Sequence, residues 1–187
     1  MRLFMGMIAL TVATGASIRD VDFKNVSIPF IYHRFISVPN KLRWMPLTGV
    51  KAVPLRNGRY TFLCDGDPCY LLTLDDVVFG NINGLPGTIA LAVVTFHTGG
   101  TATWQYLYLI ALRSGKPRIA AWLETGSRAD MGLRRAFVDH GELVLIVNDP
   151  DKREGDCCST GTITYRYKWQ DRSFHQIGAP ILADDPQ

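Results

Sequence analysis

The sequence predicts a mainly β protein: a single-domain antiparallel meander of consecutive hairpins, sandwich-like or partly propeller-like, with little helix outside a signal peptide. From Lys51 onward, short apolar runs rich in β-branched and aromatic residues are separated by turn residues. The 187 residues contain no low-complexity stretch that would link a second domain. A hydrophobic fraction of 47% with 20% charged residues is that of an ordinary folded domain.

The N-terminal segment has the features of a secretory signal peptide. Arg2 precedes an apolar run from Leu3 to Ala13, and the small residues Thr14-Gly15-Ala16 offer a cleavage site before Ser17. The run is shorter than the ~20 apolar residues of a membrane-spanning helix, and no cysteine follows it to carry a lipid. We therefore expect residues 1–16 to be removed on export, which leaves a periplasmic or secreted protein without a stable membrane anchor. A buried first helix is the alternative.

Residues 17–50 are expected to form an N-terminal arm or strand. Pro29, Pro39 and Pro46 interrupt any long regular element in this segment. An initial strand fits best around residues 28–36.

The β domain is expected over residues 51–180, followed by a tail at 181–187. Its clearest hairpin joins residues 53–56 to 59–63, because Asn57-Gly58 supplies the two positive-φ positions of a type I′ turn. Further strands are predicted at residues 70–74, 88–96, 103–112, 117–124, 135–139, 142–148 and 161–169.

Two of these strands differ in the burial that they imply. In residues 162–169, threonine, arginine and lysine alternate with one isoleucine and three aromatic residues, which predicts one buried face and one wet face. Residues 89–94 are apolar at every position, which predicts a central strand covered on both faces.

Export would place the four cysteines in an oxidising compartment, where cysteines are expected to pair. Cys64 and Cys69 flank the turn-rich Asp65-Gly66-Asp67-Pro68, which favours a local bond. That pairing leaves Cys157-Cys158 as a vicinal bridge. In the competing arrangement, one or two bonds link the loop that contains Cys64 and Cys69 to the loop that contains Cys157 and Cys158. A four-cysteine zinc site is disfavoured, because contiguous cysteines lack the usual ligand spacing.

The segment 78–94 resembles the FG-GAP-like element of exported bacterial proteins, in which an acidic loop between two strands binds calcium. Asn81 and Asn83 stand at the expected acidic positions and Leu85 follows. Calcium sites generally include carboxylates, so we expect a tight structural turn and no cofactor here.

A wider set of short motifs between residues 75 and 170 is similar to LppP/LprE-type lipoproteins, a group of uncharacterised exported bacterial domains. The lipidation cysteine is absent, and Gly126-Ser127-Arg128 lacks the acidic residue expected before the arginine. The resemblance implies a compartment and a fold, and it brings no activity. The shared motifs are the loop just described, Gly99-Gly100-Thr101, Gly126-Ser127-Arg128, and Asp156-Cys157-Cys158-Ser159 before Thr162-Ile163-Thr164-Tyr165.

No catalytic, cofactor-binding or metal-binding residue is assigned. Asp75-Asp76 and Asp149-Pro150-Asp151 lie in predicted turns, where aspartate caps backbone amides. The lysine and arginine residues are scattered and the formal net charge is only +3, so we expect no nucleic-acid partner. The four histidines lie in separate elements without metal-ligand spacing: His33, His97, His140 and His175.

Surface recognition by aromatic residues is the remaining hypothesis. If some of the aromatic residues on neighbouring predicted strands shared an exposed face, they could bind a protein, peptide or glycan. Core packing is the alternative, since a strand covered on both faces has no outward row. The residues are Trp104, Tyr106, Tyr108, Trp122 and Trp169.

The sequence therefore predicts an exported, non-enzymatic β domain with a binding or structural role. An inhibitor or immunity-type protein that binds a secreted enzyme or effector is one alternative, and it would use a rigid projecting loop at residues 64–69 or 157–158. A small exported hydrolase or thiol enzyme is another, and it would need a concave site where a histidine meets Cys158, Asp139 or Asp156.

Overall fold

The chain is mainly β and antiparallel, as the sequence predicts. Within the described residues the only helices are three short 3-10 turns, η1 (Ile18–Asp20), η2 (Phe23–Asn25) and η3 (Pro150–Lys152). In this part of the chain no helix is long and apolar enough to cross a membrane. The computed structural model describes residues 16–31, 42–47, 49–99, 103–127, 132–154 and 158–185.

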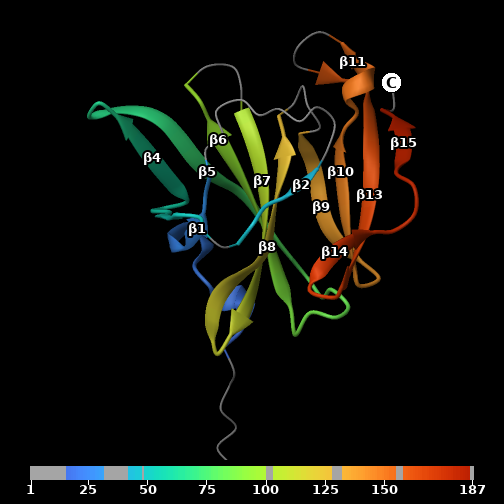
Figure 1. Cartoon of the computed structure of the whole chain (residues 1–187), viewed down its shortest axis with the longest axis horizontal. Helices are drawn as coiled ribbons and strands as arrows, with labels where there is room; N and C mark the ends of the chain where they lie inside the picture. The colour runs from blue at the N-terminus through green and yellow to red at the C-terminus, as the bar shows by residue number, and fades with distance from the viewer. Residues whose placement is uncertain are drawn as a thin grey trace, which may run out of the picture.

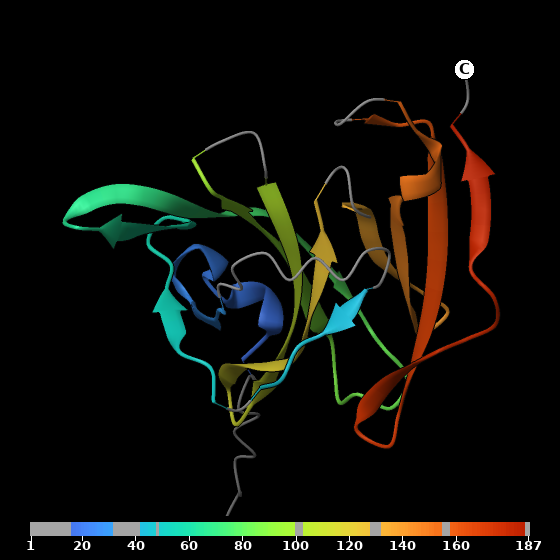
Figure 2. The same ribbon diagram turned by 45° about the horizontal axis from the view of Figure 1, so that its top comes forward.

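A six-stranded antiparallel sheet forms the centre of the molecule, in the order β2-β8-β7-β6-β5-β4. Five of its strands are sequential neighbours, which confirms the predicted meander. The sheet curls around the N-terminal segment (Figures 1 and 2). Its strands are β2 (Arg43–Trp44), β4 (Arg59–Cys64), β5 (Asp67–Gly80), β6 (Ile89–His97), β7 (Thr103–Arg113) and β8 (Lys116–Gly126).

A second antiparallel sheet lies beside the first, in the order β14-β13-β10-β9, and β15 pairs with β13 beyond β14 (Figure 1). Trp44 of β2 stacks on Phe174 of β14 with ring centroids 4.6 Å apart, which joins the two sheets. Two two-stranded sheets complete the fold, β1 with β3 and β11 with β12. The strands are β1 (Ser27–Pro29), β3 (Ala52–Pro54), β9 (Leu133–Asp139), β10 (Glu142–Asn148), β11 (Arg153–Glu154), β12 (Cys158–Ser159), β13 (Gly161–Gln170), β14 (Ser173–Gln176) and β15 (Ile181–Asp184).

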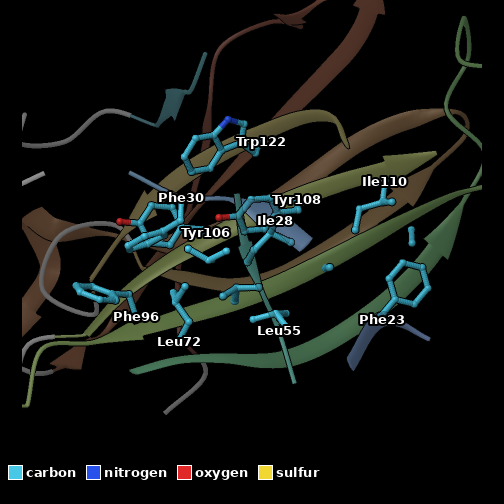
Figure 3. Close-up of a cluster of buried hydrophobic side chains, with 14 of the residues drawn as sticks. Phe23, Ile28, Phe30, Leu55, Leu72, Phe96, Tyr106, Tyr108, Ile110 and Trp122 are labelled. Carbon is cyan, nitrogen blue, oxygen red and sulfur yellow. The ribbon is translucent and has the colours of Figure 1, made fainter. Parts of the chain in front are cut away.

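The central strands β6 and β7 of the six-stranded sheet are buried on both faces. The inner cluster fills the space between this sheet and the N-terminal segment (Figure 3), and the inter-sheet cluster fills the space between the two large sheets. In β6, Ala90 and Ala92 belong to the inner cluster while Ile89 and Leu91 belong to the inter-sheet cluster. This confirms the prediction of a doubly covered strand. The buried inner cluster comprises Ile18, Phe23, Ile28, Phe30, Met45, Val53, Leu55, Leu72, Ala90, Ala92, Val94, Phe96, Tyr106, Tyr108, Ile110 and Trp122.

The N-terminal segment, expected to be an arm or a strand, contains the short strand β1 and is part of the core. Ile18, Ile28 and Phe30 are only 3%, 1% and 6% exposed. The ring of Phe30 lies 5.0 Å from that of Phe96, centroid to centroid. The predicted initial strand is found only at Ser27–Pro29, where it pairs with β3, and residues 32–41 lie outside the described part of the chain.

The predicted hairpin at Asn57-Gly58 is right about the turn and about a strand on either side of it, and wrong about the pairing of those strands. Asn57 and Gly58 have φ values of 51° and 77°, as a type I′ turn requires. Across this turn only Arg56 bridges Arg59. The residues before it pair with β1 instead, because that pairing buries Val53 in the inner cluster.

The predicted tail also forms a strand. Residues Ile181–Asp184 pair with Gly161–Thr164 of β13, and the Asp185 carboxylate receives two hydrogen bonds from Arg134, at 2.6 and 2.7 Å. β14 pairs with β13 only at the other end, from Tyr167 onward. β15 therefore provides hydrogen-bond partners for the backbone groups of β13 that do not pair with β14.

Asp75-Asp76 does not form a turn. Both residues lie inside β5, which runs on to Gly80 past a β-bulge between Leu74 and Asp76. The bulge absorbs the extra residue, so the ladder with β6 continues. Asp149 does cap a backbone amide, since its Oδ1 accepts a hydrogen bond from the Asp151 N–H at 3.0 Å.

Candidate functional site

Three of the five aromatic residues considered for a recognition surface lie in the core, which is the alternative stated above. Tyr106, Tyr108 and Trp122 are 4%, 0% and 0% exposed, and Figure 3 shows them inside the inner cluster. The Tyr108 hydroxyl donates to the Pro29 carbonyl at 2.8 Å, and the Trp122 Nε1–H donates to the Pro46 carbonyl at 2.9 Å. Both polar tips are thus satisfied inside the protein. The N-terminal segment covers the face that a recognition surface would need to leave free.

The other two aromatic residues of the set are half-buried and lie apart. Trp104 packs against the inner cluster, whereas Trp169 packs against the inter-sheet cluster and meets the Phe174 ring edge-on at 4.9 Å. The set therefore forms no common recognition surface.

His140 is the described histidine that meets Asp139, one of the residues named for the enzymatic alternative. His140 Nε2 lies 3.6 Å from Asp139 Oδ1, but the His140 side chain is 92% exposed on the turn after β9. Arg166 donates to the Asp139 carboxylate at 2.6 Å and lowers the pKa of that carboxyl. His33, Asp156 and Cys157 lie outside the described residues, as does the side chain of Cys158.

The loop after β5 forms a turn in which the Leu85 N–H donates to the Ile82 carbonyl at 3.1 Å. Ile82 is only 2% exposed. The Asn83 backbone N–H donates to the Gly141 carbonyl at 2.9 Å, and its side-chain amide donates to the His140 carbonyl. The loop thus packs against the turn between β9 and β10. Among the described residues, no three His, Cys, Asp or Glu side chains gather as metal ligands.

Cys64 and Cys69 form a disulfide bond with their Cα atoms 5.6 Å apart, which confirms the local pairing. The tight turn between β4 and β5 uses Asp65 and Gly66 at φ values of 53° and 94°. A β-bulge leaves Cys69 as the extra residue between the pairs Leu63–Pro68 and Phe62–Tyr70. The bulge and the turn together bring the two sulfur atoms within bonding distance.

The tip of this hairpin carries an exposed apolar side chain. Figures 1 and 2 show the β4–β5 hairpin extending from the body of the molecule. Leu63, next to the disulfide, is 67% exposed, and Asp65 and Asp67 are exposed beside it. We define the stapled tip as residues 62–70.

The other side of the hairpin is fixed to the core. The Phe62 ring lies 5.8 Å from the Phe96 ring, and the Tyr70 ring lies 5.5 Å from it, between centroids. Leu63 is therefore held outward on a rigid support. Sequence patterning did not single out Leu63, although the strand alternation around Phe62 places it on the opposite face.

Comparisons with protein-family models, with curated proteins and with solved structures found no match to this chain. The likeness to LppP/LprE-type lipoproteins and to an FG-GAP element remains an expectation from short motifs. The geometry of the chain itself is therefore the basis for assigning a function.

Proposed function

We propose that this chain is an exported, non-enzymatic binding domain that docks onto a protein partner through the stapled tip. The observation that carries the proposal is Leu63, which is 67% exposed on a hairpin closed by the Cys64–Cys69 bond. A large apolar side chain held out in solvent by a cross-linked support is typical of an interface residue.

Preorganisation is the physical advantage of this element. A disulfide across a short loop and aromatic packing at its base reduce the conformational entropy that binding would otherwise cost. Burying the Leu63 side chain in a partner would contribute about 1.5–3 kcal/mol. Asp65 and Asp67 flank this residue, so the complementary partner surface is an apolar pocket rimmed by lysine or arginine.

Export is supported by the same disulfide, because such bonds persist in oxidising compartments. The signal-like residues 1–16 agree with it, although residues 1–15 lie outside the described part of the chain. Intact mass of the exported protein should show loss of these residues and an oxidised Cys64–Cys69 pair. A retained N-terminus with free thiols would contradict export.

An inhibitor or immunity-type role is the form of this function that the geometry favours. That reading requires a rigid projecting loop, and the stapled tip fits the requirement.

Site-specific photo-crosslinking in the exporting cells tests the docking element. A photoreactive phenylalanine analogue at position 63 should give a discrete adduct that disappears in the Cys64→Ser/Cys69→Ser variant. Leu182 is the matched control, because it is 62% exposed and lies on β15 of the other sheet. Absence of an adduct at position 63, or the same adduct from position 182, would overturn the proposal.

A further inference from the structure

Two pockets adjoin each other along the first residues of β8, near the hairpin that joins β7 to β8. One has a volume of 560 Å³ and the other a volume of 340 Å³. Leu47, Arg118 and Ile119 line both of them, so they share one wall. The larger volume is within the usual range of small-molecule sites.

The pockets exist because the neighbouring strand of β8 is short. β2 pairs with β8 only at Leu123 and Glu124, and the last backbone hydrogen bond along this edge runs from the Met45 N–H to the Trp122 carbonyl. Among the described residues, no strand covers the edge of β8 before Trp122 on this side. Leu47, which is 48% exposed, lies beside this open edge.

One pocket opens on each face of the sheet. The larger pocket is lined by Val26, Val50 and Ile110, which belong to or pack against the inner cluster. The smaller pocket is lined by Ala111 and Trp169, which belong to or pack against the inter-sheet cluster. An elongated apolar ligand would therefore contact side chains of the existing core.

The charges in the two walls are all positive. Arg118 lines both pockets and Arg113 lines the smaller one, while neither wall contains aspartate or glutamate. No ion pair joins Arg113 or Arg118 to another described residue. By contrast, Arg134 and Arg166 are bound to carboxylates of their own chain.

We propose that these adjoining pockets bind one molecule of a free fatty acid. Its acyl chain lies against the apolar side chains of the walls, and its carboxylate binds Arg118. Two properties select this ligand class. The walls offer half-buried apolar side chains to one extended chain, and the guanidinium donors match a carboxylate bidentately. Arg113 adds positive charge beside the same wall. This site is separate from the stapled tip.

Binding of cis-parinaric acid, a fluorescent long-chain fatty acid, to the purified exported protein tests the proposal. Saturable fluorescence enhancement is expected, with the methyl ester of the same acid binding at least roughly tenfold more weakly because it has no charge. Arg118→Gln should weaken the acid by a similar factor and leave the ester unchanged. Arg135→Gln removes a guanidinium on β9, outside both pockets, and should bind the acid like the unaltered protein.

Leu47→Asp is a second variant at a half-exposed position, so its folding does not depend on core packing. It should also weaken the acid, since it places a carboxylate in the shared wall. Lack of saturable binding, or equal affinity for acid and ester, would overturn the proposal. Uptake of phosphatidylglycerol from vesicles without uptake of the free acid would overturn it too, in favour of a two-chain lipid. None of these three outcomes bears on docking through Leu63.

Discussion

Replacement of Ile28 by alanine tests whether the N-terminal segment is core or arm. Ile28 is 1% exposed in β1 and belongs to the inner cluster. The methyl and methylene groups removed account for about 2 kcal/mol of transfer free energy at ~0.8 kcal/mol each. The cavity left between β1 and the curled sheet adds to this, so we expect a loss of about 3 kcal/mol in the free energy of unfolding.

Urea denaturation of the purified exported protein, followed by tryptophan fluorescence, measures this loss. A destabilisation of about 3 kcal/mol lowers the midpoint by roughly 1 M or more at an unchanged slope. Ser27→Ala is the matched control, because Ser27 is the exposed neighbour in the same strand, and it should change stability by less than ~0.5 kcal/mol. An equally small effect of Ile28→Ala would refute the placement of this segment in the core.

Three further outcomes are expected. Cys64→Ala/Cys69→Ala, which opens a loop with a sequence separation of 5, should cost about 2 kcal/mol in urea denaturation by the chain-entropy estimate; an unchanged midpoint would contradict it. Burial raises the pKa of Tyr167 from 10.0 to about 12, so the unfolded chain loses this proton first and stability should fall as pH rises from 10 toward 12. Tyr167→Phe should flatten that decline in an alkaline melting series, and an equally steep decline would count against the assignment. Gly141→Ala should cost about 1–3 kcal/mol, because Gly141 has a φ of 82° and an added Cβ would lie 2.4 Å from the Asn83 side chain; a thermal melt at the wild-type temperature would contradict this.

The strands themselves could be predicted because their signals are local. Uninterrupted apolar residues in 89–94 indicated a doubly covered strand, and alternation in 162–169 indicated one buried face that includes Tyr167. The turn residues between Cys64 and Cys69 likewise favoured their bond, since a short turn alone can bring two Cα atoms to disulfide distance.

The candidate sites could not be predicted in the same way. Periodicity showed that Tyr106 and Tyr108 share a face, but it could not show that Ile28 and Phe30 cover that face. The exposure of Leu63 depends on the β4–β5 hairpin extending from the rest of the molecule. The pockets beside Arg118 depend on β2 pairing with only two residues of β8.

The sequence by itself determined the fold class and the order of the central strands and favoured the local disulfide, because each depends on neighbouring residues and on strand periodicity. Only the tertiary structure decided which sheet faces are exposed to solvent and which strand edge is left uncovered. Burial of a face depends on segments far away in sequence, such as the one that carries Phe30 to Phe96. Those segments contain little regular structure, so their packing leaves no periodic signal in the sequence.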